Sequence, residues 1–151
     1  MTRLRPARAR ERRPTMRLRD IAIDAHAIEQ GEWVDDLPGL DGVRVLVRGI
    51  GNADYRRLQA KLMRKVTPAE SINGMSPERG DEITTKLLAE TVLLGWEGIE
   101  DDDGAPLAYS KEKAVELLAD PALRRFRDGV MFAATTVGER RAAQAEADAK
   151  N

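Results

Sequence analysis

The pattern of apolar and polar residues predicts a small β element near the N-terminus. Val43, Val45 and Val47 stand at alternate positions and so share one face of an extended segment. Two turn-forming pairs, Pro-Gly and Asp-Gly, separate this segment from Trp33-Val34. We therefore expect a β-hairpin or small meander over residues 32–48, in which Trp33-Val34 pairs with the valine segment.

Beyond residue 50, apolar residues recur every three or four positions, which is the spacing of amphipathic helices. This spacing predicts four helices, over residues 53–66, 77–94, 111–119 and 121–137. Asn52 or Asp54 is placed to cap the first helix, and Pro68 with the polar stretch after it breaks that helix. Ser76 followed by Pro77 begins the second helix, which has the widest apolar face and is expected to be the most buried.

The segment between the second and third helices has the pattern of a hairpin. It runs from Trp96 to Tyr109 and contains the acidic turn Glu100–Asp103, which Gly104 follows. Because short apolar runs flank this Asp-Gly turn on both sides, we expect a hairpin-like excursion here.

Together these elements predict an α+β, mainly helical fold, in which a small N-terminal β-hairpin or meander is followed by about four helices. An alternation at Ile21 and Ile23 adds a short strand or extended lead-in. Residues 16–138 are expected to form the folded domain. Residues 1–15 contain two prolines and no apolar face, and so are expected to be disordered. Residues 139–151 lose the large apolar side chains and are expected to fray.

Charge is unevenly distributed along the chain. Residues 1–19 hold eight arginines against Glu11 alone, a net charge of +7, so the remainder carries −8 of the formal total of −1. Clustered arginines neutralise phosphates, which makes the leader a candidate nucleic-acid arm. The alternatives are a solvated tail or translation that starts at Met16. The acidic remainder makes nucleic-acid binding by the folded body unfavourable.

The composition excludes several classes of protein. The chain has no cysteine, which rules out disulfides, thiolate metal sites and cysteine nucleophiles. No apolar run approaches the ~18 residues that a membrane span needs. No apolar segment follows the basic N-terminus, as a signal peptide would require. We therefore expect a cytosolic protein with no membrane partner.

The acidic turn does not have the spacing of a calcium loop. An EF-hand loop with Gly104 as its glycine would place its first ligand at Ile99 and its last at Ser110. Neither residue is a carboxylate, so the pattern fails at both ends. The turn is interpreted as solvated, and no metal site is expected.

Patterns for cofactor binding and catalysis are also incomplete. Gly49 and Gly51 follow a strand, but the third glycine of a dinucleotide loop would fall on Asp54, whose charge would repel a pyrophosphate. His26 is the only histidine, and no serine lies in a nucleophile elbow. We therefore expect a non-enzymatic protein with no catalytic residues and no cofactor.

Two tryptophans are the candidate partner contacts. Trp33 and Trp96 each lie beside turn residues and acids, outside the regular helical stripes, and Ile99 and Tyr109 accompany the second of them. Tryptophan is enriched at the centres of interfaces, where it supplies a large apolar area and one hydrogen-bond donor. The alternative is that both tryptophans fill the core, because large aromatic side chains dominate core energetics too.

The order of several short motifs carries a family resemblance. An apolar helix ends in Gly95-Trp96, and the acidic Asp-Gly turn, a proline, the Tyr109-Ser110 cap and a helix ending in Leu117-Leu118 follow. The upstream stretches 30–34 and 47–58 continue the pattern. In this order and spacing, over roughly residues 17–137, the chain resembles the tail assembly chaperones of long-tailed bacteriophages.

The resemblance implies a non-enzymatic assembly factor. Such proteins bind the tape measure protein and recruit tail tube subunits during tail morphogenesis in the host cytoplasm, and they are absent from the mature virion. The arginine-rich leader departs from the family pattern. A different class therefore stays open, a small regulatory or nucleic-acid-associated protein that uses the leader.

Overall fold

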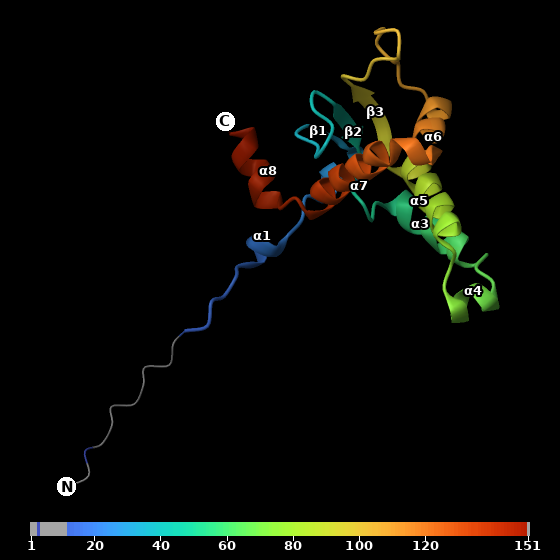
Figure 1. The fold of residues 1–151 in the computed structure, drawn as a ribbon. Coiled ribbons are helices and arrows are strands. Elements are labelled where there is room, and N and C mark those ends of the chain that lie inside the picture. Colours follow the sequence, from blue (N-terminus) through green and yellow to red (C-terminus); the bar gives the residue numbers. More distant parts are fainter. Residues whose placement is uncertain (1–2, 4–11, 151) are drawn as a thin grey trace.

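The computed structural model describes residue 3 and residues 12–150 (Figure 1). The leader predicted over residues 1–15 therefore lies largely outside the described residues. The chain is α+β and mainly helical, as predicted. Its elements in order are α1 (Leu18–Ile21), α2 (Ala25–Gln30), β1 (Glu32–Val34), β2 (Arg44–Val47), α3 (Ala53–Met63), α4 (Pro68–Asn73), α5 (Pro77–Thr91), β3 (Leu93–Glu97), α6 (Lys111–Ala119), the 3₁₀ turn η1 (Pro121–Leu123), α7 (Arg124–Glu139) and α8 (Ala142–Ala149).

The sheet is antiparallel and has the strand order β1-β2-β3. Trp33 lies opposite Leu46 and Val34 opposite Val45, which confirms the predicted hairpin. The third strand was not predicted, because the helix expected to reach residue 94 ends at Thr91 and the chain enters β3 at once. Local sequence allows either structure there, and pairing with the free edge of β2 decides for the strand.

The main core lies between the inner face of this sheet and α7. Val45 and Val47 are fully buried and meet Val130 and Ala134 of α7, which are fully buried as well. The predicted valine face is therefore confirmed, since Val43 also packs against this cluster. The sheet thus has one covered face and one face that is open to solvent.

A second, smaller cluster joins α3 to α5. Leu62 of α3 packs with Ile83 and Leu87 of α5, all of them buried. The first helix, predicted to reach residue 66, ends at Met63. Pro68 was expected only to break this helix, but it also lies at the start of a further helix, α4. Thr67 and Glu70 form a capping box that begins α4, with Pro68 in its first turn.

Helices α1 and α8, near the two ends of the chain, lie side by side. The strand expected near Ile21 and Ile23 is absent, since short helices α1 and α2 flank a single bridge between Ile23 and Arg141. The tail forms helix α8, which lies beside α1 and has no buried residue (Figure 1). Its alanine-rich sequence favours a helix even without core contacts. No helix among the described residues is both long and apolar enough to cross a membrane.

Candidate partner-binding site

A groove of about 510 Å³ lies between α5 and α6. Its lining has two parts: small or apolar side chains, which we call the floor, and charged side chains of α5, mainly carboxylates, which we call the rim. The floor residues are Thr85, Ala89, Val115, Ala119 and Pro121, and the rim residues are Glu78, Asp81, Glu82, Lys86 and Glu90. An apolar floor with an acidic rim can hold an apolar stripe of another chain and keep the surroundings hydrated.

The groove forms because α5 and α6 meet through small side chains. Ala89 and Ala114 are buried at this contact, and the Thr85 hydroxyl donates a hydrogen bond to the carbonyl oxygen of Leu118 (3.3 Å). Pro121 then starts η1 directly after α6 and lines the end of the groove. Val115 stays 44% exposed on the floor, so an apolar surface is available to a partner.

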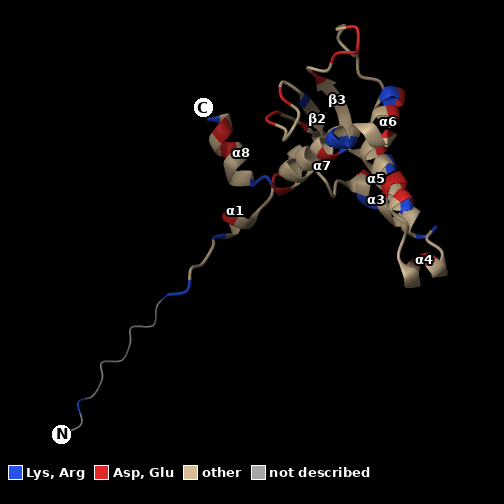
Figure 2. Ribbon diagram, viewed as in Figure 1, with Lys and Arg blue, Asp and Glu red and all other residues tan. Residues whose placement is uncertain are grey.

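The rim is only partly neutralised by nearby cations. Asp81 lies 3.1 Å from the guanidinium of Arg127, and Glu82 lies 3.4 Å from that of Arg79. Within the described part of the chain, Glu78 and Glu90 belong to no ion pair. Figure 2 shows acidic residues along this helix. The rim therefore favours a partner that carries Lys or Arg beside its apolar residues.

The open face of the sheet is a second exposed surface. Trp33 is 41% exposed, and the Arg44 guanidinium stacks 4.3 Å above the centre of its ring. Arg44 also donates a hydrogen bond from Nε to Glu97 (2.6 Å), which lowers the pKa of that carboxyl. The arginine thus holds the indole in place while one of its faces stays accessible. Leu94, on β3 of the same sheet, is exposed as well.

The other three predicted contact residues belong to the core. Trp96 is 6% exposed, meets the rings of Tyr109 and Phe126 edge-on at 5.0 and 5.8 Å, and donates from Nε1 to the carbonyl oxygen of Leu107 (2.8 Å). Tyr109 and Ile99 are half-buried against the same cluster. The structure therefore brings Trp96, Ile99 and Tyr109 together inside the protein and places Trp33 apart from them.

The acidic turn uses its carboxylates within the turn itself. Asp101 accepts hydrogen bonds from the backbone amides of Asp103 and Ala105, both at 2.9 Å, and a bridge between Glu100 and Pro106 closes the predicted hairpin-like excursion. Among the described residues, no three His, Asp or Glu side chains gather where they could hold a metal ion.

Sequence reasoning missed the groove, although one signal was present. Glu78, Glu82, Lys86 and Glu90 recur every four residues and so form a charged stripe beside the buried face of α5. The sequence does not reveal that small residues on α6 leave a hollow next to that stripe.

Comparison with known proteins gives one family match. The model of the YdaY prophage protein family matches residues 50–151, about two thirds of the chain. No curated protein and no solved structure matches it. The matched segment contains the α5–α6 groove and lies outside β1 and β2. The chain belongs to the YdaY prophage protein family and is therefore a phage-related protein.

Proposed function

We propose that this protein is a non-enzymatic tail assembly chaperone that binds the tape measure protein and recruits tail tube subunits in the host cytoplasm. In this proposal it leaves before the virion is complete. The observation that carries the proposal is the α5–α6 groove, with its apolar floor and acidic rim, in a chain of a prophage family. The resemblance to tail assembly chaperones supports the identity of the client.

The groove suits a client that must be held and then released. A tape measure protein is long and helix-rich, and its helices need cover for apolar stripes until they pack in the tail. A single groove of this size covers only a short stretch of helix, which favours moderate affinity. The carboxylates around it keep the complex charged and soluble.

The Trp33 surface is the second contact in this proposal. Its indole is exposed but fixed by Arg44, so little conformational entropy is lost when a partner covers it. Trp96 and Tyr109 support the sheet from the core side and contribute through stability. In this proposal the tape measure protein binds the α5–α6 groove, and a tail tube subunit binds the Trp33 surface of the sheet.

Co-expression with the tape measure protein tests the proposal. Val115→Asp places a charge on the groove floor and is expected to reduce recovery of soluble client about tenfold, the equivalent of ~1.4 kcal/mol. Phe132→Asp is the matched control, because Phe132 is exposed to a similar extent (46%) on α7 and does not line the groove. It should behave as wild type.

Each outcome has a distinct meaning. If both variants solubilise the client as well as wild type does, the groove is not the client site. If the wild-type protein neither binds nor solubilises the client, the chaperone assignment itself is wrong.

The alternative is a nucleic-acid-associated regulator that uses the leader, and the +7 charge of residues 1–19 favours it. Removal of residues 1–15 separates the two functions. A chaperone keeps its client without the leader, whereas a regulator of this kind loses its nucleic acid.

A further inference from the structure

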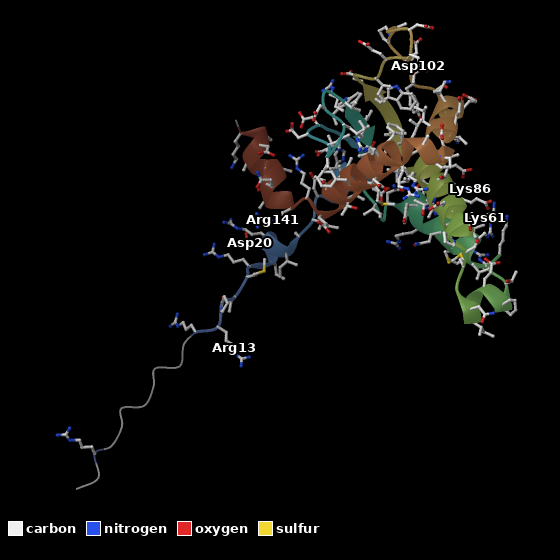
Figure 3. The ribbon with its side chains drawn as sticks, in the orientation of Figure 1. Arg13, Asp20, Lys61, Lys86, Asp102 and Arg141 are labelled. Atoms are coloured by element: carbon white, nitrogen blue, oxygen red, sulfur yellow. The ribbon has the colours of Figure 1, made fainter. Side chains whose placement is uncertain are left out.

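The exposed side of α3 and the turn after it form a basic surface on a body with a net negative charge. The sequence from residue 55 to residue 69 contains no acid. Its five cationic side chains are all exposed, and we call them the α3 basic face: Arg56, Arg57, Lys61, Arg64 and Lys65. Figure 2 shows Lys and Arg along this helix, and Lys61 is labelled in Figure 3.

Little of this positive charge is neutralised within the protein. Arg57 lies 3.4 Å from Asp54, but the other oxygen of that carboxylate already holds Arg48 at 2.8 Å. The remaining four cations of the α3 basic face enter no ion pair with another described residue. The surface is therefore available to an external anion.

Helix stability does not explain the arrangement. Arg57 and Lys61 stand four residues apart and Lys61 and Arg64 three, so like charges are neighbours on the helix surface. Each such pair costs about 0.2–0.5 kcal/mol. The opposite side of α3 is held against α5 by Leu62, so the helix presents these charges in a fixed orientation.

The side chains of the α3 basic face favour nucleic acid over protein as the partner. Protein interfaces have an apolar or aromatic core, but here the exposed uncharged positions are few and none is aromatic: Gln59, Ala60 and Met63. Without a ring on which bases could stack, the surface lacks the stacking platform that single-strand binders use. Contacts from these cations to phosphates fix position but carry no sequence information. Arginine and lysine side chains still neutralise phosphates, and the release of counterions then drives binding.

We propose that the α3 basic face binds the phosphate backbone of nucleic acid without sequence preference. This revises the expectation, drawn from the net charge of −8 after residue 19, that the folded body is repelled by phosphate. The net charge of −8 is a sum over the whole segment after residue 19, in which acidic residues elsewhere outweigh the cations of α3. The face and the α5–α6 groove lie on different sides of α5, since Leu87 contacts α3 and Ala89 lines the groove. The inference is thus independent of client binding.

The test measures binding of the full chain to a short fluorescent DNA duplex by anisotropy over a series of salt concentrations. The triple variant Arg56→Gln, Lys61→Gln, Arg64→Gln removes three cations that have no ion pair. It should weaken binding at low salt at least about tenfold and reduce the slope of log K against log salt by about 2–3, because each phosphate contact contributes ~0.9.

A matched variant removes the same charge from the leader: Arg8→Gln, Arg10→Gln, Arg12→Gln. The proposal requires that the α3 variant loses affinity whatever the leader variant does. The α3 variant should melt at the same or a higher temperature, because it loses only like-charge repulsion. If the α3 variant binds DNA as wild type does, the proposal is overturned. It is also overturned if the wild-type protein binds no DNA, including the case in which it self-associates at low salt instead.

Discussion

The side chain of Asn52 offers the sharpest test of how this fold is held together. It is fully buried, and its amide nitrogen donates to the carbonyl oxygens of Thr91 (2.8 Å) and Gly49 (3.0 Å). Its carbonyl oxygen accepts from the backbone amide of Tyr55 (2.9 Å) and so caps α3. One side chain thus joins the start of α3, the loop before it and the end of α5.

The cost of Asn52→Ala follows from these three bonds. Loss of the cap costs about 0.5–2 kcal/mol. Each of the two other hydrogen bonds contributes about 0.5–1.5 kcal/mol. The Gly49 carbonyl oxygen would still accept from the backbone amide of residue 52 (3.2 Å), whereas the Thr91 carbonyl oxygen would lose the Asn52 side chain. The free energy of unfolding should therefore fall by about 1.5–5 kcal/mol, a large part of the ~5–15 kcal/mol typical of a domain.

Urea unfolding followed by far-UV circular dichroism measures this loss. Asp54→Ala is the control, because the sequence allows either residue to cap α3. Asp54 is exposed and forms ion pairs with Arg48 and Arg57, which solvent screens, so its loss should destabilise the protein much less than the loss of Asn52. A loss below about 1 kcal/mol for Asn52→Ala, or an equal loss for Asp54→Ala, would refute the reasoning.

Three further predictions concern other parts of the fold. Trp96→Ala should lower the free energy of unfolding by ~3–5 kcal/mol. Trp33→Ala should cost less, ~1–3 kcal/mol, because 41% of that residue is already exposed, and urea unfolding distinguishes the two variants. Gly98→Ala should destabilise much more than Gly104→Ala in thermal melts. Both glycines have a positive φ, but a Cβ at residue 98 would meet the Gly42 carbonyl oxygen at 2.0 Å, whereas at residue 104 the nearest atom is 3.9 Å away. The pKa of Glu97 is lowered by its hydrogen bond from Arg44, and that of Asp54 by Arg48. Their folded pKa values lie below the unfolded ones, so their contribution to stability is present above the ordinary carboxyl pKa and is lost as the pH falls through the lowered values. Unfolding midpoints measured down to acid pH should fall less steeply for Glu97→Gln.

The sequence by itself determined the features that depend on neighbouring residues. Alternation predicted the pairing of β1 with β2, and the three- and four-residue spacing predicted α3, α5, α6 and α7. Ser76 and Ser110 cap their helices through local hydrogen bonds to the third residue after them, as their positions indicate. Such contacts span a few residues, so a linear pattern contains them.

Only the tertiary structure decided the features that depend on distant partners. Residues 93–97 could continue a helix, and β2 makes them a strand across an interval of about fifty residues. Trp33 and Trp96 have similar local surroundings in the sequence, but register turns Trp33 to the open face of the sheet while Trp96 packs on α7. The α5–α6 groove exists because small side chains from two helices meet. In each case the deciding quantity is a distance between segments, which periodicity along one segment does not contain.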